Sequence, residues 1–161
     1  MLSESLQAIE FIFKQYSKKA DQEELTLHLR ETLHREIALN NELVQEAYEL
    51  GENDPELKNR LLSKTSCESF QAICMMGLPL EKILPEDWSF KEESASEPQK
   101  SYRSQFQSIG TLAELVERGY HRLRIQQIRS ELAQDKRSSS LEYLSQLLLA
   151  SKLATAPPRS A

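Results

Sequence analysis

Residues 33–44, LHREIALNNELV, lie at the centre of the pattern that decides the fold. Apolar residues recur here at spacings of three and four, which places them on one face of an α-helix. The stripe extends in both directions and consists of Leu25, Leu29, Leu33, Ile37, Asn40, Val44 and Ala47. Asn40 is its polar member, and Glu36 lies one turn before it. The sequence therefore predicts a long helix from Gln22 to about Leu50 with an amide on its buried face.

Glu36 and Asn40 have two interpretations. An asparagine on an apolar stripe can hydrogen-bond to a neighbouring helix and penalise wrong registers, at some cost in stability. We therefore interpret the pair first as a structural polar contact that fixes how helices pack. The alternative is a functional site in which both side chains line an exposed groove.

Capping signals divide the remaining chain into further helices. Asp54 followed by Pro55 predicts a short helix that ends near Ser63. Two T-x-x-E boxes, Thr65–Glu68 and Thr111–Glu114, predict that helices begin there. The other expected helices are one that starts near Ser3 or Ser5, one turn between Pro79 and Pro85, one from Leu112 to about Lys136, and one from Leu141 to Leu153. The fold class is therefore all-α, a bundle of about five to six helices with one long second helix.

The 161 residues are expected to form a single domain, because this length can bury a core without further stabilisation. Residues 91–103, KEESASEPQKSYR, are charged and small, so we expect a long loop or linker between the two halves. Residues 155–161 are expected to be a disordered tail. No apolar run approaches the roughly 20 residues of a membrane span. The N-terminus also lacks a basic start and a cleavage site, so we expect a cytoplasmic protein without membrane contact.

Cys67 and Cys74 are the two cysteines of the chain. Both fall in one predicted helix, where two turns separate them by about 10 Å, which is too far for a disulfide. We expect both to be small buried apolar residues in a reducing compartment.

Charge differs between the two halves of the chain. Residues 1–100 hold 11 Lys and Arg against 20 Asp and Glu, whereas residues 101–137 hold 7 against 4. The chain as a whole is too acidic for a general nucleic-acid binder. The two halves can face each other, or the basic part can face a partner.

The basic part contains a candidate interaction face. Arg118, Arg122 and Arg129 fall near one side of the predicted helix, with His121 nearby. Such a face can clamp phosphates, which makes nucleic acid an alternative partner. It can equally pair with the acids of residues 42–56, and the acidic first half favours this internal pairing. Together with Glu36 and Asn40, these four residues are the interaction candidates of the sequence.

Metal chemistry finds little support. Glu31 and His34 form a Glu-x-x-His, which di-iron bundles use, but such sites need a second copy. The other near-match, Glu117 and His121, has a different spacing, and Arg30 beside His34 would repel a cation. We therefore expect no metal, no cofactor and no catalytic residue.

Nuclease chemistry is a further alternative. Helical RNases of the HEPN kind carry an Arg and a His with four to six residues between them on one helix. Arg30 and His34 have three residues between them, and Arg118 and His121 have two. Neither pair meets the pattern, so a divergent HEPN-like RNase is an alternative based on helical architecture alone.

The pattern L-x-x-E-I-x-x-N-x-x-L covers Leu33, Glu36, Ile37, Asn40 and Leu43. It resembles a helix in small uncharacterised helical proteins of prokaryotic mobile-element and defence operons. The resemblance implies an accessory or effector-associated helical protein without a defined chemistry. The expected function is therefore non-enzymatic protein–protein contact in a prokaryotic multiprotein system, with a protein partner or a second copy of the chain.

Overall fold

The computed structural model describes residues 2–15, 22–132 and 138–157. These ranges are helical except for connecting segments and one isolated antiparallel β-bridge between Asp87 and Thr111. The predicted all-α fold is thereby confirmed. The helices are α1 (Leu2–Gln15), α2 (Gln22–Leu50), α3 (Pro55–Ser63), α4 (Glu68–Met75), α5 (Leu80–Ile83), the 3₁₀ turn η2 (Glu92–Ser94), α6 (Glu97–Ser101), α7 (Arg103–Gln107), α8 (Leu112–Glu131) and α9 (Ser138–Thr155).

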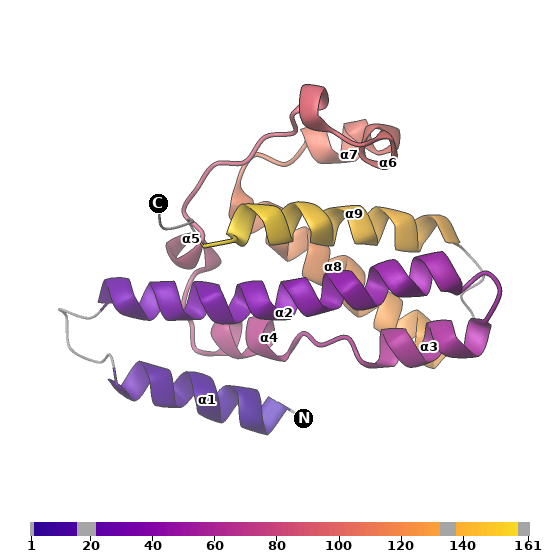
Figure 1. Cartoon of the computed structure of the whole chain (residues 1–161). Helices are drawn as coiled ribbons and strands as arrows, with labels where there is room; N and C mark the ends of the chain where they lie inside the picture. Colours follow the sequence, from indigo (N-terminus) through magenta and orange to yellow (C-terminus); the bar gives the residue numbers. More distant parts are fainter. Residues whose placement is uncertain (1, 16–21, 133–137, 158–161) are drawn as a thin grey trace.

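The long helix α2 is the centre of the bundle, and its predicted bounds are confirmed. All seven residues of the predicted stripe are buried, each at most 8% exposed. Figure 1 shows α9 running alongside α2, with α3 and α4 on the other side of α2. Hydrogen bonds from Tyr48 to Glu142 and between His34 and Thr155 show that α2 and α9 are antiparallel.

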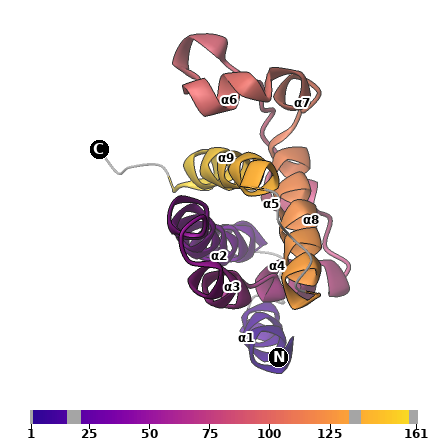
Figure 2. The ribbon, with the colours of Figure 1, turned by 90° about the vertical axis from the view of Figure 1, so that its right-hand side faces the viewer.

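Helix α8 crosses the stack diagonally and packs on α9 and α3. Figure 2, turned by 90°, shows α9, α2 and α3 stacked on one side with α8 along the other. At the far end of the stack, α1 packs on α4. Its Ile9 is 1% exposed and belongs to the same hydrophobic core as the α2 stripe. The described helices therefore share one core.

Residues 91–103 are not the unstructured loop that their composition predicts. They contain η2, all of α6 and the first residue of α7, and Figure 1 shows this segment beyond α9, away from the rest of the bundle. The Ser96 hydroxyl accepts from the backbone N–H of Gln99, whose side chain accepts from the backbone N–H of Ser96. This capping box, with Pro98 in the first turn, initiates a helix in a segment with few apolar residues.

The predicted capping box at Thr65 and Glu68 is wrong. Helix α4 begins at Glu68 itself, and the Thr65 hydroxyl donates to the carbonyl of Leu62 instead. The cap comes from Glu36 of α2, which a local motif cannot reveal. The second predicted box holds in part, because the Thr111 hydroxyl accepts from the backbone N–H of Glu114.

Both ends of the last helix differ from the prediction. Helix α9 extends from Ser138 to Thr155, not from Leu141 to Leu153. Thr155 is 1% exposed, so the expected disordered tail does not include it. Residues 158–161 lie outside the described residues, as do the expected end of the preceding helix near Lys136 and the surrounding residues 133–137.

Cys74 also differs from the prediction. Cys67 is buried as expected, but Cys74 is exposed, and both are free thiols. Cys67 precedes the first turn of α4, with φ −112° and ψ 11°, so helical spacing does not relate the two side chains. The buried side of α4 instead carries Ser69, Ala72 and Ile73.

Candidate functional site

Asn40 and Glu36 join α2 to the start of α4. The Asn40 amide nitrogen donates to the carbonyl of Ser66 at 2.7 Å, and the Ser66 backbone N–H donates back to the Asn40 Oδ1 at 2.9 Å. The Glu36 Oε2 accepts from the backbone N–H of Ser69 at 2.8 Å, and its Oε1 accepts from that of Phe70 at 3.3 Å. Glu36 therefore caps α4 from a different helix, where a carboxylate is favoured by the helix dipole.

Tyr120 of α8 completes this inner network. Its hydroxyl donates to the Glu36 Oε1 at 2.7 Å, and its ring stacks on Phe70 with centroids 4.3 Å apart. Burial, and then the nearby Glu36 carboxylate, raise the pKa of Tyr120 well above its usual range. Burial likewise raises the pKa of the Cys67 thiol to about 11. Both groups therefore stay protonated at neutral pH and are unsuited to nucleophilic or base chemistry.

The inner network explains the amide on the apolar stripe. Asn40 bonds to backbone in the turn between α3 and α4, not to a facing helix. It satisfies the backbone donor and acceptor of the partly buried Ser66, which have no helical partner. Glu36 and Asn40 thus have intramolecular partners that account for their polar atoms.

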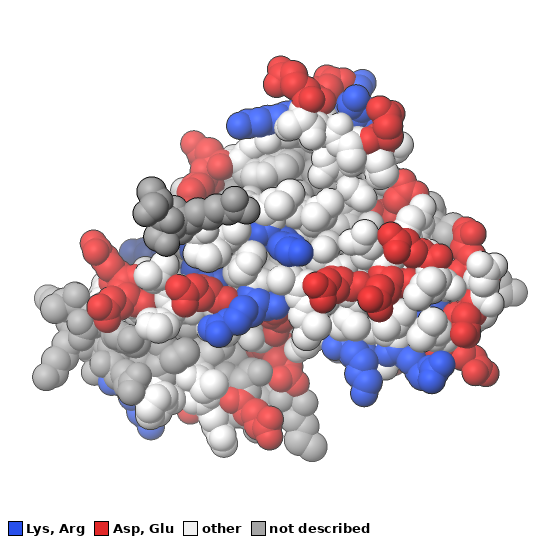
Figure 3. Space-filling view, in the orientation of Figure 1, with Lys and Arg blue, Asp and Glu red and all other residues white. Residues whose placement is uncertain are grey.

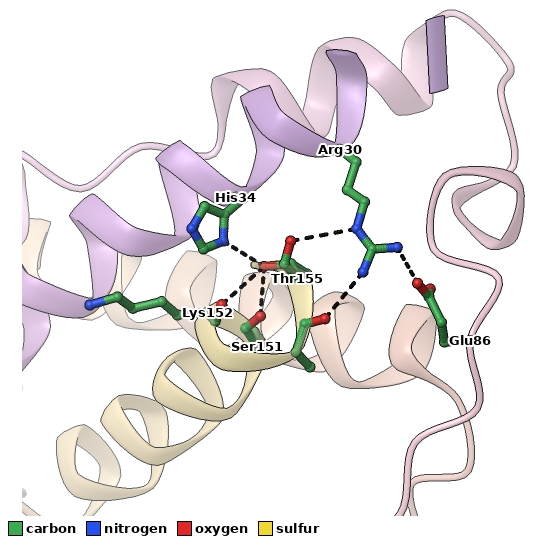
Figure 4. A network of polar contacts seen from close by, with 7 residues as sticks. Arg30, His34, Glu86, Ser151, Lys152 and Thr155 are labelled. Atoms are coloured by element: carbon green, nitrogen blue, oxygen red, sulfur yellow. Dashed lines mark hydrogen bonds and ion pairs between the residues drawn. The ribbon is translucent and has the colours of Figure 1, made fainter. Parts of the chain in front are cut away.

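Arg30 and His34 form an outer network at the C-terminus of α9 (Figure 4). The Arg30 guanidinium donates to the carbonyls of Ala154 and Thr155 at 3.2 and 3.5 Å, and it pairs with the Glu86 carboxylate. Cationic side chains favour the carbonyl end of a helix. Arg30 therefore ties α9 and the segment after α5 to α2.

His34 adds a second contact to the same helix end. Its Nδ1 lies 3.0 Å from the Thr155 hydroxyl, which itself donates to the carbonyl of Ser151 at 2.7 Å. Since a hydroxyl has one proton, His34 must donate from Nδ1. Burial, and then the charges of Lys152 and Arg30, lower the pKa of His34. The structure brings Arg30 and His34 together, but both hold the end of α9, Arg30 through backbone carbonyls and His34 through the buried Thr155 hydroxyl.

The four candidates on α8 do not act as one face. The Arg118 guanidinium donates to the Gln105 carbonyl at 2.8 Å and to the Ser108 hydroxyl at 2.9 Å, so it holds the end of α7. Arg122 lies over the Tyr143 ring at 5.2 Å, His121 is exposed, and Arg129 is partly buried. In the described part of the chain, no ion pair joins these arginines to the acids of α2.

A groove lies between α9 and two connecting segments, one that precedes α6 and one that follows α7. Its volume is about 830 Å³. Aromatic and apolar side chains line much of it, and its charged lining residues are Asp87 and Lys91. The lining includes Trp88, Phe90, Phe106, Ile109, Ala150 and Leu153. Leu153 is 68% exposed, so the groove presents an apolar edge to solvent.

Local aromatic packing holds the groove in shape. The rings of Trp88 and Phe90 lie 6.0 and 5.8 Å from that of Phe106 on α7. Behind them, Phe106 also contacts Tyr143 of α9 at 6.0 Å. Figure 3 shows a largely uncharged surface over α9 and toward α6 and α7, whereas acidic side chains gather over α2. Sequence reasoning missed this groove, although Trp88 and Phe90 in a polar stretch were its signal.

Two further properties concern the kind of site. Among the described residues, no group of three or more His, Cys, Asp or Glu side chains is arranged to hold a metal ion. Within the same residues, no helix combines the length and the apolar character needed to cross a membrane.

Comparisons of the chain with protein-family models, with curated proteins and with solved structures return no match.

Proposed function

We propose that this chain is a non-enzymatic interaction protein, an accessory subunit in the cytoplasm of a prokaryote. It binds an apolar segment of a protein partner in the groove between α9 and residues 86–110. The resemblance of the α2 pattern to accessory proteins of mobile-element and defence operons is in line with this role.

The groove is the observation that supports the proposal. Its volume of about 830 Å³ falls in the range of roughly 300–1,000 Å³ typical of binding pockets. Large aromatic side chains in a preformed pocket are the usual anchors of protein interfaces. Trp88, Phe90 and Phe106 provide such a surface, and exposed Leu153 extends it.

The polar candidates support binding better than catalysis. Asn40 is hydrogen-bonded to the backbone of Ser66, and the Tyr120 hydroxyl donates to Glu36. Arg30 and His34 hold the end of α9. A general base or nucleophile needs reach to a substrate atom, and these groups already face intramolecular partners. The pair Arg30 and His34 therefore gives no support to the HEPN-like alternative, because both side chains are engaged at the end of α9.

A matched pair of variants tests the proposal. Leu153→Glu places a charge on the edge of the groove, whereas Leu39→Glu places the same charge on α2, where the leucine is 52% exposed. We expect proteins that copurify with the tagged chain from its source cells to be lost with Leu153→Glu and retained with Leu39→Glu. Identical copurifying proteins for both variants and the parent would exclude the groove as the interface.

Sedimentation velocity separates a foreign partner from a second copy of the chain. If the groove binds another copy, the purified parent protein dimerises and Leu153→Glu is monomeric, while Leu39→Glu still dimerises. If the partner is foreign, all three proteins sediment as monomers, and only copurification distinguishes them.

A further inference from the structure

One wall of the groove is a short stretch of extended backbone. The backbone N–H of Trp88 donates to the carbonyl of Gly110 at 3.1 Å, and that of Leu112 donates to the carbonyl of Glu86 at 3.0 Å. These two bonds surround the bridge between Asp87 and Thr111. In an antiparallel pair, the N–H and C=O of the residue between such bonds point away from the partner strand. Those of Asp87 therefore point to the opposite edge.

The extended conformation continues to Lys91. Lys91 has φ −108° and ψ 103°, and exposure alternates along the segment. Trp88 and Phe90 are half-buried against Phe106, whereas Asp87, Ser89 and Lys91 are exposed. Alternation with period two is the property of a strand, so Ser89 presents its backbone on the same edge as Asp87.

This edge has no partner. Across the described residues, no hydrogen bond is made by the backbone N–H or C=O groups of Asp87 and Ser89. Both residues line the groove. An unpaired strand edge beside an apolar pocket is the arrangement that binds extended peptides by strand addition, where main-chain bonds give affinity and side-chain pockets give specificity.

The charges along the edge specify an orientation. Asp87 and Lys91 are the charged residues of the lining, and neither is in an ion pair within the described residues. Antiparallel pairing places residues of a bound strand directly opposite those of the edge, on the same face. An incoming strand then needs an acid opposite Lys91, a base opposite Asp87, and apolar side chains opposite Trp88 and Phe90.

We infer that the groove binds an extended peptide of a protein partner as an antiparallel strand on the Asp87–Ser89 edge. Its sequence pattern from N- to C-terminus is acidic, apolar, polar, apolar, basic. This inference rests on the proposed function and specifies the class of partner segment. The apolar residues enter the pocket beside Phe106 and Leu153, and the charged ends meet Lys91 and Asp87.

The probe is an acetylated and amidated peptide, Glu-Leu-Thr-Leu-Lys, titrated against the full chain. Trp88 is the sole tryptophan, so its fluorescence reports on the groove directly. We expect saturable binding. The same peptide with an N-methyl group on the threonine amide keeps all side chains but cannot donate to the Ser89 carbonyl. We expect it to bind at least tenfold more weakly, because a methyl group on the paired amide removes a bond and obstructs the edge.

A charge exchange tests the orientation. The reversed peptide, Lys-Leu-Thr-Leu-Glu, has the same composition and is expected to bind the parent protein at least several-fold more weakly. The double variant Asp87→Lys with Lys91→Glu changes two exposed side chains without altering the net charge, and it should prefer the reversed peptide.

Two results overturn the inference. One is the absence of saturable binding by the first peptide, and the other is equal affinity of the parent and N-methylated peptides. If Leu153→Glu still abolishes copurification in either case, the groove remains the interface and only the strand pairing is excluded. If Leu153→Glu has no effect on copurification while the peptides bind as expected, the peptide site stands and the proposed function fails.

Discussion

The two polar networks lie on different sides of α2 and differ in how completely the protein excludes water from them. The inner network joins Asn40, which is 0% exposed, to Glu36 and Tyr120, which is 2% exposed. In the outer network, the Arg30 side chain is 17% exposed and that of Glu86 is 46% exposed. Removing a partner from the inner network leaves a buried polar group without a hydrogen bond, whereas water can replace a lost partner in the outer network. Polar residues on the same helix therefore contribute different amounts to the free energy of unfolding.

The largest effect is expected for Glu36→Ala. This change removes the acceptor of the Tyr120 hydroxyl and of two backbone N–H groups at the start of α4. Because these donors are buried or partly buried, we expect a loss of about 3 kcal/mol in the free energy of unfolding. Urea denaturation measures it through the midpoint and slope of the transition.

Glu36→Gln is the matched control for this prediction. Glutamine keeps one acceptor oxygen and the shape of the side chain, so it should lose clearly less stability than alanine. Equal losses for the two variants would mean that the packing of the side chain and a single acceptor oxygen contribute nothing, so that the fold depends on the charge of the Glu36 carboxylate or on both of its oxygens.

The next largest effect is expected for Asn40→Leu. The apolar stripe alone suggests that leucine would fit, yet it would leave the N–H and C=O of Ser66 without their partner. We expect a loss of about 2 kcal/mol, from the cost of unpaired backbone groups. Thermal and urea unfolding measure it, with the exposed Gln45→Leu on the same helix as a control within about 0.5 kcal/mol. Unchanged or higher stability of Asn40→Leu would show that the Ser66 contact is dispensable.

A smaller effect is expected from pH in the outer network. The folded state lowers the pKa of His34, so below the unfolded value of 6.5 the unfolded chain binds more protons. The stability that neutral His34 contributes is therefore complete above about pH 6.5 and is lost as the pH falls toward the lower folded pKa.

Comparison with His34→Gln isolates this contribution. Urea midpoints of both proteins at pH 7.5, 6.5 and 5.5 should show a stability difference that shifts in favour of the variant as the pH falls. A difference that is constant with pH would mean that His34 has the same proton affinity in both states. A stability difference that shifts against the variant as the pH falls would mean that the folded state raises the pKa of His34, as a nearby carboxylate does and Lys152 and Arg30 do not.

The smallest effect on stability is expected for Leu153→Glu, which touches neither network. Its side chain is 68% exposed, so the free energy of unfolding should stay within about 0.5 kcal/mol of the parent. Differential scanning fluorimetry and urea denaturation check this. A loss above about 1 kcal/mol would show that Leu153 packs in the folded chain. Phe90→Ala would then replace Leu153→Glu as the variant that tests the groove.

Local patterns in the sequence determined the helices and their buried faces. The stripe from Leu25 to Ala47 predicts both the bounds of α2 and the burial of every member, because helical periodicity depends on neighbours three and four residues apart. The caps at Asp54 and Thr111 are equally local. The helix in residues 97–101 also has a local signal, Ser96 to Gln99, which composition obscures.

Only the tertiary structure decided which side chains meet. Glu36 reaches Tyr120 across 84 residues of sequence, and His34 reaches Thr155 across 121. The groove likewise needs α9 beside the extended segment at Trp88. No local spacing encodes such pairs, because they depend on which helices pack together and at what angle. The amide at Asn40 is visible in the sequence, but its partner, the backbone of Ser66, exists only once α4 is docked on α2.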